Sequence, residues 1–262
     1  MDNPSIIYLA INLPRSSARR AMLAEQERVA GIDIQIVPAV SGAELTPEQK
    51  AMYDSRKRTS MYPADLTPNE QACMHSHLKA LRTFLESGAD YGAVFEDDVL
   101  LPENFRAGID FLLTRVQGWQ AVKLYTDNSR LYTICPTVPG TPLHPVFPKK
   151  VLWGAVGYLY SRTGAEQILR HLSSFWMGAD AMLGEVMLKH RIPVIGVSPN
   201  LVGTAFPANE QSDIDDGGNR LQQEKRRSLP VYLRYRASVI RTAMQKNGMR
   251  ALLRRCIRIV PS

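Results

Sequence analysis

Three consecutive acids, Glu96-Asp97-Asp98, follow directly on the apolar segment 91–95. Such a segment is typical of a strand buried on both faces, so we expect the acids at its carboxyl end. Adjacent carboxylates repel one another unless a cation or hydrogen-bond donors compensate their charge. Their hard oxygens favour Mg²⁺ or Mn²⁺, ions that usually bind substrate phosphates as well. The pattern predicts a metal–phosphate site. The alternative is a solvated turn in which the acidic cluster is incidental.

Two histidines, His75 and His77, have the spacing of a metal-binding pair in a strand. Here they follow Thr67-Pro68-Asn69-Glu70, a capping box with proline at the first helical position. On a helix the two side chains lie roughly 200° apart, so we expect that they do not share one metal. His77 lies close in angle to Glu70, and these two residues could border one site. The alternative is that His77 is a structural histidine.

Asp180 precedes the apolar stripe of a predicted helix over 179–190, where it could be a helix cap or a catalytic carboxylate. The residues by themselves favour the cap. The glycine-rich motifs of Rossmann dehydrogenases and of P-loop proteins do not occur, nor do GxSxG or HExxH. The sequence therefore gives no support to those classes of nucleotide-binding protein and hydrolase.

The elements that must position these residues alternate along the chain. Buried or alternating apolar segments predict strands, and caps with a 3.6-residue apolar period predict helices. The expected strands are 6–13, 34–40, 91–95, 121–125, 151–160 and 192–197, and the expected helices are 15–30, 67–87, 163–173 and 179–190. Residues 41–66 and 127–148 are expected to be irregular. This order predicts an α/β fold with a mostly parallel sheet, in which ligands bind at the carboxyl ends of the strands.

Composition narrows the class of protein further. The chain has 262 residues, of which 45% are hydrophobic and 22% charged, so disorder and fibrous repeats are excluded. No window of about 18 apolar residues predicts a membrane span, and the first residues lack the basic character of an export signal. Three widely spaced cysteines fit a reducing cytoplasm better than a disulfide framework.

Four blocks, taken in order, resemble glycosyltransferase family 25, the bacterial lipopolysaccharide and lipooligosaccharide glycosyltransferases that are related to collagen galactosyltransferase domains. Residues 11–19 (INLPRSSAR) resemble its INLDRSxxR opening, and residues 66–77 resemble its LTPGExGCxxSH block. Residues 94–99 (VFEDDV) are similar to its acidic strand end, and residues 153–165 to its WGxxxYxxSxxGA segment. Together the blocks span roughly residues 5–200.

The resemblance implies a GT-A-like, Rossmann-related fold and an inverting, metal-dependent transfer of a hexose, galactose in the first instance, from a UDP-sugar. The implied acceptor is a lipid-linked lipopolysaccharide, lipooligosaccharide or related surface glycan. Glu96 and Asp98 would hold Mn²⁺ or Mg²⁺, and Asp180 would be the catalytic base. The residues implied to bind the donor are Asn12, Leu13, Arg15, Arg19, Glu70, Ser76, His77, Asp97, Trp153 and Gly154. For Asp97, contact with the donor and a place at the metal both stay open.

Two other classes of function use the same acids. The first is a metal-dependent phosphoesterase or nucleotidyltransferase, which would turn over the donor without an acceptor. The second is a non-catalytic, membrane-attached binding module in which the acids are structural. Binding of uridine diphosphate with and without Mn²⁺ distinguishes the binding module from both enzymes.

Positive charge is concentrated at the carboxyl end. Residues 222–262 hold eleven Lys and Arg and a single acid, for a net charge of +10, whereas residues 1–221 carry −3. A nucleic-acid enzyme would more often spread positive charge over its active face, so we expect no nucleic-acid partner. The sequence thus predicts a transferase domain over 1–221 and a basic tail over 222–262.

The tail is expected to be an amphipathic helix. Met249, Leu252, Leu253, Cys256, Ile257 and Val260 follow an apolar helical template, with Arg250, Arg254, Arg255 and Arg258 on the opposite arc. Such a helix suits an anionic surface, so we expect a cytoplasmic protein held peripherally at the inner face of the membrane. The alternative is a helix packed on the body with its basic side in solvent.

Overall fold

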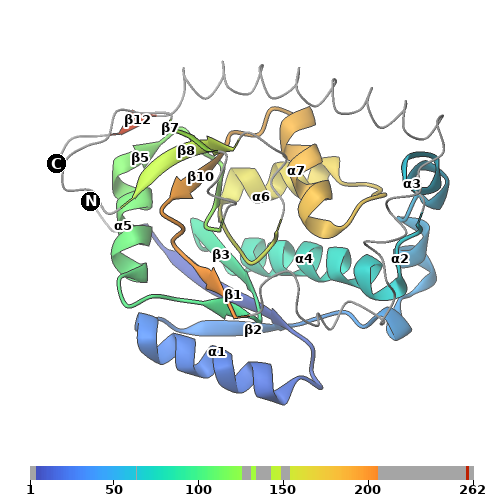
Figure 1. Ribbon diagram of the computed structural model, residues 1–262, viewed down its shortest axis with the longest axis horizontal. Coiled ribbons are helices and arrows are strands. Elements are labelled where there is room, and N and C mark those ends of the chain that lie inside the picture. The colour runs from blue at the N-terminus through green and yellow to red at the C-terminus, as the bar shows by residue number, and fades with distance from the viewer. Residues whose placement is uncertain are drawn as a thin grey trace.

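The computed structural model describes residues 4–62, 64–125, 131–133, 143–148, 154–205 and 258–259. Its centre is an eight-stranded sheet with helices on both faces (Figure 1). From one edge to the other the strands are β2 (Ile34–Pro38), β1 (Ile6–Asn12), β3 (Tyr91–Glu96), β9 (Gly157–Ser161), β6 (Ala121–Lys123), β10 (Val194–Ser198), β8 (His144–Pro148) and β7 (Leu131–Thr133). The predicted α/β class is confirmed.

The direction of the strands is mostly parallel, as expected, although the pairing is mixed. Strands β2, β1 and β3 pair in parallel, as do β6 and β10. Strand β9 runs antiparallel between β3 and β6, and β8 runs antiparallel between β10 and β7. The carboxyl ends of β1, β3 and β6 therefore meet at one edge, where the amino end of the reversed β9 joins them.

Helices cover the two faces of the sheet (Figure 1). One face packs against α4 (Pro68–Glu86), α6 (Arg162–His171) and α7 (Ala179–Lys189). The other packs against α1 (Ser17–Ala30) and α5 (Phe105–Arg115). Alternate residues of one strand divide between the two cores, as Leu9 and Ala10 do, because successive side chains of a strand point to opposite faces. Both faces of the central strands are thus buried.

The predicted ends of two helices are confirmed. At the start of α4 both capping-box hydrogen bonds are present: the Thr67 side chain accepts from the Glu70 backbone, and the Glu70 carboxylate accepts from the Thr67 backbone. Helix α1 ends at Gly31, which has φ +61°. Glycine suits this left-handed position because it has no Cβ.

The segment 41–66 is more regular than predicted. It contains a 3₁₀ turn, η1 (Gly42–Glu44), and two short helices, α2 (Pro47–Ala51) and α3 (Ser55–Met61). Helix α2 starts with a complete capping box at Thr46, and the Asp54 side chain caps α3. The prediction of an irregular segment was wrong because it overlooked cap signals of the kind that identified α4.

Other elements also differ from the predictions. Part of the expected loop 127–148 forms β7 and β8, and the two prolines of β8 conceal its strand signal. Strand β9 begins at Gly157 rather than near residue 151, after Gly154 with φ +82°. Helix α6 is capped by Ser161 and begins at Arg162, one residue before the expected start at 163. The sequence also did not reveal α5 or the two-stranded sheet of β4 (Val99–Leu100) with β11 (Gly203–Thr204).

Of the predicted basic tail, only Arg258–Ile259 lie among the described residues. They form β12, antiparallel to β5 (Val116–Gln117). The expected helical face to Val260 is therefore wrong at these two residues, because their backbone is extended and pairs with the body. The other residues of the tail lie outside the described part of the chain. Among the described helices, none is long and apolar enough to cross a membrane.

Candidate active site at the carboxyl edge of the sheet

The three acids lie where the sequence placed them, at the carboxyl end of a central strand. Strand β3 ends at Glu96, and Asp97 and Asp98 form the turn into β4. Asp97 is buried, whereas Glu96 and Asp98 are half-buried. The carboxyl end of β1 lies beside this turn, and that of β6 lies on the far side of β9 at the same edge.

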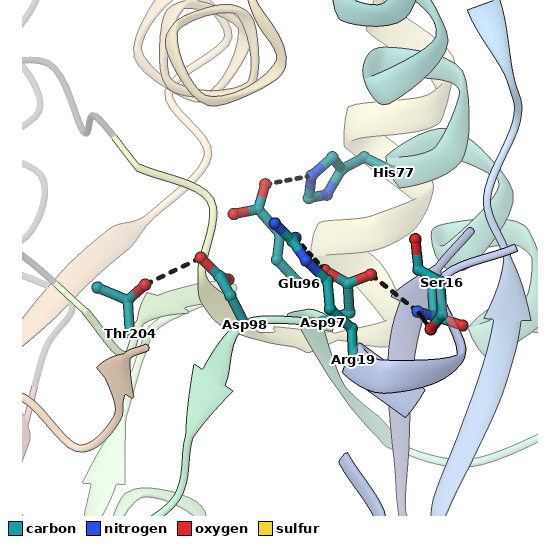
Figure 2. Close-up of polar contacts among 8 residues, drawn as sticks. Ser16, Arg19, His77, Glu96, Asp97, Asp98 and Thr204 are labelled. Carbon is teal, nitrogen blue, oxygen red and sulfur yellow. Dashed lines mark hydrogen bonds and ion pairs between the residues drawn. The ribbon is translucent and has the colours of Figure 1, made fainter. Parts of the chain in front are cut away.

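Asp97 is paired with residues of the first strand–helix turn (Figure 2). Its Oδ1 accepts from Arg19 Nη1 at 2.7 Å, and its Oδ2 accepts from Asn12 Nδ2 at 2.8 Å. Asn12 also accepts at its Oδ1 from the Arg20 guanidinium, a contact that the sequence did not suggest. Both oxygens of Asp97 are thus engaged in fastening α1 to β3.

The other predicted residues of the first block, Leu13 and Arg15, belong to the same strand–helix turn. Leu13 is half-buried, and the side chain of Arg15 is exposed. Exposure at the sheet edge leaves the Arg15 guanidinium accessible to a ligand. The predicted donor-binding roles of Leu13 and Arg15 stay predictions.

The two histidines of α4 face different partners, as the helical spacing predicted. His77 Nε2 lies 3.5 Å from Glu96 Oε1, with 3% of the histidine side chain exposed (Figure 2). His75 Nε2 lies 2.9 Å from the carbonyl oxygen of Gln49. Only His77 of this pair is therefore at the acidic edge.

Glu70 and Ser76 serve the fold in ways that the sequence alone did not separate from donor binding. The Glu70 carboxylate caps α4. The Ser76 hydroxyl donates to the Ala72 carbonyl and accepts from Val40 N–H, which fastens α4 to the segment after β2. These hydrogen bonds account for both residues structurally, and their roles in donor binding stay predictions.

Asp98 has the environment expected of a cation ligand. Its Oδ2 accepts from the Thr204 hydroxyl at 2.9 Å, whereas its buried Oδ1 has no hydrogen-bond partner among the described residues. Desolvation, and then repulsion from Glu96, raise the pKa of the Asp98 carboxyl. A hard divalent cation between Glu96 and Asp98 would satisfy the free oxygen and compensate the repulsion, so the residues fit Mg²⁺ or Mn²⁺.

Asp180 and Gly154 are brought together at the start of α7. Asp180 Oδ2 accepts from Gly154 N–H at 2.7 Å, and its Oδ1 accepts from Ala181 N–H. The cap of α7 is Gly178, so the interpretation of Asp180 as the helix cap is wrong. Asp180 instead holds the segment that leads into β9. Trp153, the neighbour of Gly154, lies outside the described residues.

Lys123 is a residue of this edge that the sequence-based predictions missed. It ends β6, its side chain is 1% exposed, and its Nζ lies 5.7 Å from the centre of the Tyr158 ring. Burial lowers the pKa of Lys123 to about 8, against the opposing effect of Asp180 and Glu96. The only feature of the sequence that could have indicated Lys123 as a site residue is its position at the end of an apolar strand. The structure thus adds a buried cation that interacts electrostatically with Asp180 and Glu96.

Replacement of Lys123 by methionine should change how stability depends on pH. The folded state binds the proton of the Lys123 ammonium less tightly than the unfolded chain does. The free energy of unfolding of the wild type therefore increases as pH rises through about 8. Relative to Lys123→Met, wild type should gain about 1–2 kcal/mol between pH 7.5 and 9.5, measured by urea unfolding. The control Lys50→Met removes an exposed lysine and should follow wild type. A parallel profile for Lys123→Met would contradict the buried charge.

Comparison with known proteins places this site in a family. The model of glycosyltransferase family 25 (LPS biosynthesis protein) matches residues 6–183. The chain is 29% identical over 211 residues to the lacto-N-neotetraose biosynthesis glycosyltransferase LgtB of Neisseria meningitidis serogroup A, covering 73% of this chain and 71% of that protein. It is 22% identical to the lipooligosaccharide biosynthesis protein lex-1 of Haemophilus influenzae (72% and 66% covered).

A further relative comes from an animal. The chain is 25% identical over 166 residues to procollagen galactosyltransferase 1 of Danio rerio, covering 61% of this chain and 28% of that protein. The region matched by the family model contains the first strand–helix turn, helix α4, the acidic turn and the start of α7, which are the elements that build the carboxyl edge. The chain belongs to glycosyltransferase family 25 and is a glycosyltransferase.

Proposed function

We propose that this enzyme transfers a hexose, galactose in the first instance, from a UDP-sugar to a lipooligosaccharide or related surface-glycan acceptor, with inversion at the anomeric carbon. The names of the relatives support the sugar and the acceptor class, because they include a lipooligosaccharide biosynthesis protein, a lacto-N-neotetraose biosynthesis glycosyltransferase and a procollagen galactosyltransferase. The observation that carries the proposal is the pair Glu96 and Asp98, with a buried, unpartnered carboxylate oxygen at the carboxyl edge of the described sheet. We further infer that the sheet is the core of a GT-A-like fold.

Glu96 and Asp98 would hold Mn²⁺ or Mg²⁺. When bound, such an ion supplies positive charge to the diphosphate leaving group as a Lewis acid. The protein adds a fixed cation at the same edge, because Lys123 is buried and interacts electrostatically with Asp180 and Glu96. Preorganised charge of this kind stabilises a developing anion without reorganisation of solvent.

We propose that the donor binds first at the turn between β1 and α1. Arg19, Asn12 and Asp97 form one hydrogen-bonded unit that fixes the first strand–helix turn. In a doubly wound sheet, the turn after a strand at the carboxyl edge is suited to a nucleotide. Leu13, Arg15, Glu70, Ser76, His77, Trp153 and Gly154 complete the proposed donor side.

Asp180 is proposed as the base that takes the proton of the acceptor hydroxyl. Inversion requires such a group on the face opposite the leaving diphosphate. Backbone N–H donors hold both of its oxygens, yet each oxygen keeps a second acceptor site. The carboxylate is therefore oriented and still able to accept a proton.

Replacement of Asp98 tests the metal assignment. Asp98→Asn keeps the shape of the side chain, and an amide oxygen can still accept from Thr204, but the charge is lost. Sugar transfer should fall below a tenth of the wild-type rate, and the Mn²⁺-dependent part of UDP affinity in isothermal titration should disappear. Asp110→Asn, at an exposed position of α5, is the matched control and should behave as wild type. Turnover above a tenth of wild type in Asp98→Asn would exclude this role.

Replacement of Asp180 tests the base. Asp180→Asn should lower kcat at least about a hundredfold, the lower range of positioned acid–base catalysis, with little change in the affinity for UDP and Mn²⁺. Single-turnover rates and donor titrations measure the two effects separately. A parallel fall in donor affinity would assign Asp180 to the donor or metal site instead.

We also propose that the basic tail attaches the enzyme to the inner face of the cytoplasmic membrane, near a lipid-linked acceptor. Each Lys or Arg close to anionic lipid contributes about 1 kcal/mol, so four engaged side chains give roughly 4 kcal/mol. Because Arg258–Ile259 pair with β5, the proposed lipid contact lies in the residues before them.

Neutralisation of the tail tests attachment without removing β12. The variant Arg250→Gln/Arg254→Gln/Arg255→Gln should lose sedimentation with anionic liposomes at low salt, because the attraction to the surface is electrostatic. Its turnover on a small water-soluble acceptor should stay close to wild type. Failure of the wild-type enzyme itself to sediment with these liposomes would show that the tail is not an anchor.

A further inference from the structure

A second group of metal-ligating side chains converges beside the acidic turn. Cys73 and His77 lie four residues apart on α4, so both face the same side of the helix one turn apart. Glu96, at the end of β3, faces them. The Cys73 Sγ, a ring nitrogen of His77 and a carboxylate oxygen of Glu96 all lie within 4.8 Å of one another.

The spacing of these atoms is close to that of a zinc site. With ordinary Zn²⁺ bond lengths in a tetrahedron, neighbouring ligand atoms lie about 3.3–3.6 Å apart. His77 Nε2 and Glu96 Oε1 are already 3.5 Å apart. Adjustment of the Cys73 and Glu96 rotamers by about 1 Å would complete three ligand positions and leave the fourth for water.

The chemistry of this donor set differs from that of the acidic turn. Glu96 and Asp98 offer only hard oxygens, which suit Mg²⁺ and Mn²⁺, whereas a thiolate and an imidazole favour a softer ion such as Zn²⁺. Cys73 is half-buried and takes no part in the proposed transfer. Glu96 is the one residue that belongs to both sets of metal ligands.

We propose that Cys73, His77 and Glu96 form a site for a thiophilic divalent cation of the Zn²⁺ class, whose occupancy opposes that of the Mn²⁺ or Mg²⁺ site. On binding, the Cys73 thiol releases its proton to solvent as the sulfur–metal bond forms, while His77 binds as the neutral imidazole. The Glu96 charge then compensates the first cation, and a second dication nearby is repelled. The proposal that this site binds a cation is independent of the proposed function, whereas the proposal of antagonism rests on it.

Binding is tested with Co²⁺, which substitutes for Zn²⁺ and gives a thiolate charge-transfer absorption in the near ultraviolet. The full chain carrying Cys135→Ser/Cys256→Ser retains Cys73 as its only thiol. Titration of this protein should give one Co²⁺ per chain with thiolate absorption, and Zn²⁺ should displace the Co²⁺. Absence of the thiolate absorption would overturn the proposal.

Variants in the same background assign the ligands. Cys73→Ser should abolish the thiolate absorption and weaken Zn²⁺ binding by more than about a hundredfold in competition titrations. His75→Gln is the matched control, because His75 lies on the same helix and faces Gln49 instead. It should bind Co²⁺ as its parent does. Unchanged Zn²⁺ affinity in Cys73→Ser would also overturn the site.

Antagonism is tested by the ratio of Mn²⁺-dependent transfer with and without micromolar Zn²⁺, taken separately for each protein. The ratio should fall about tenfold or more for wild type and much less for Cys73→Ser. Equal inhibition of both proteins, or stimulation by Zn²⁺, would overturn the antagonism.

If no UDP-hexose supports transfer while Co²⁺ still binds through Cys73, the proposed function fails and the site stands. If transfer occurs without Co²⁺–thiolate absorption, the site fails and the proposed function stands.

Discussion

The charge of three adjacent carboxylates at the end of a buried strand is the constraint on which this edge of the molecule depends. In the fold, each of the three carboxylates has a different partner. The charge of Asp97 is compensated within the protein by Arg19. The Arg19 side chain is 19% exposed and the Asp97 side chain 11%. Loss of one member of such a largely buried pair typically costs about 3–5 kcal/mol. The pair therefore holds the turn between β1 and α1 against the acidic turn.

Glu96 and Asp98, on either side of Asp97, are compensated less completely. Glu96 has a long contact to His77, and Asp98 uses one oxygen on Thr204 and leaves the other without a partner in the described chain. A site that binds a cation must retain acceptors of this kind, because a fully hydrogen-bonded carboxylate has less to offer an ion. This difference supports the proposed metal-binding role of the two outer acids, whereas the central acid fixes the first strand–helix turn.

The reversed strand β9 brings the remaining residues to the same place. It is inserted between β3 and β6, and its amino end pairs with the carboxyl ends of both, Gly157 opposite Phe95 and Tyr158 opposite Lys123. The segment before β9 is thereby led across the edge, where Gly154 meets Asp180 from α7. Lys123 and Asp180 come from distant parts of the sequence, and only this sheet order makes them neighbours of Glu96.

The sequence by itself determined the elements with strong local signals. The capping box at Thr67, the glycine after α1 and the continuous apolar strands are governed by contacts within a few residues, so β1, α1, α4 and β3 could be predicted, and with them the position of the acids. The short helices α2 and α3 and the cap at Ser161 have local signals too, and these were overlooked or misassigned. Tertiary structure alone decided the pairing of Asp97 with Arg19 and Asn12, the burial of Lys123 and the approach of Cys73 to Glu96. These contacts depend on the order of strands and on packing across the sheet, which link residues that no local pattern connects.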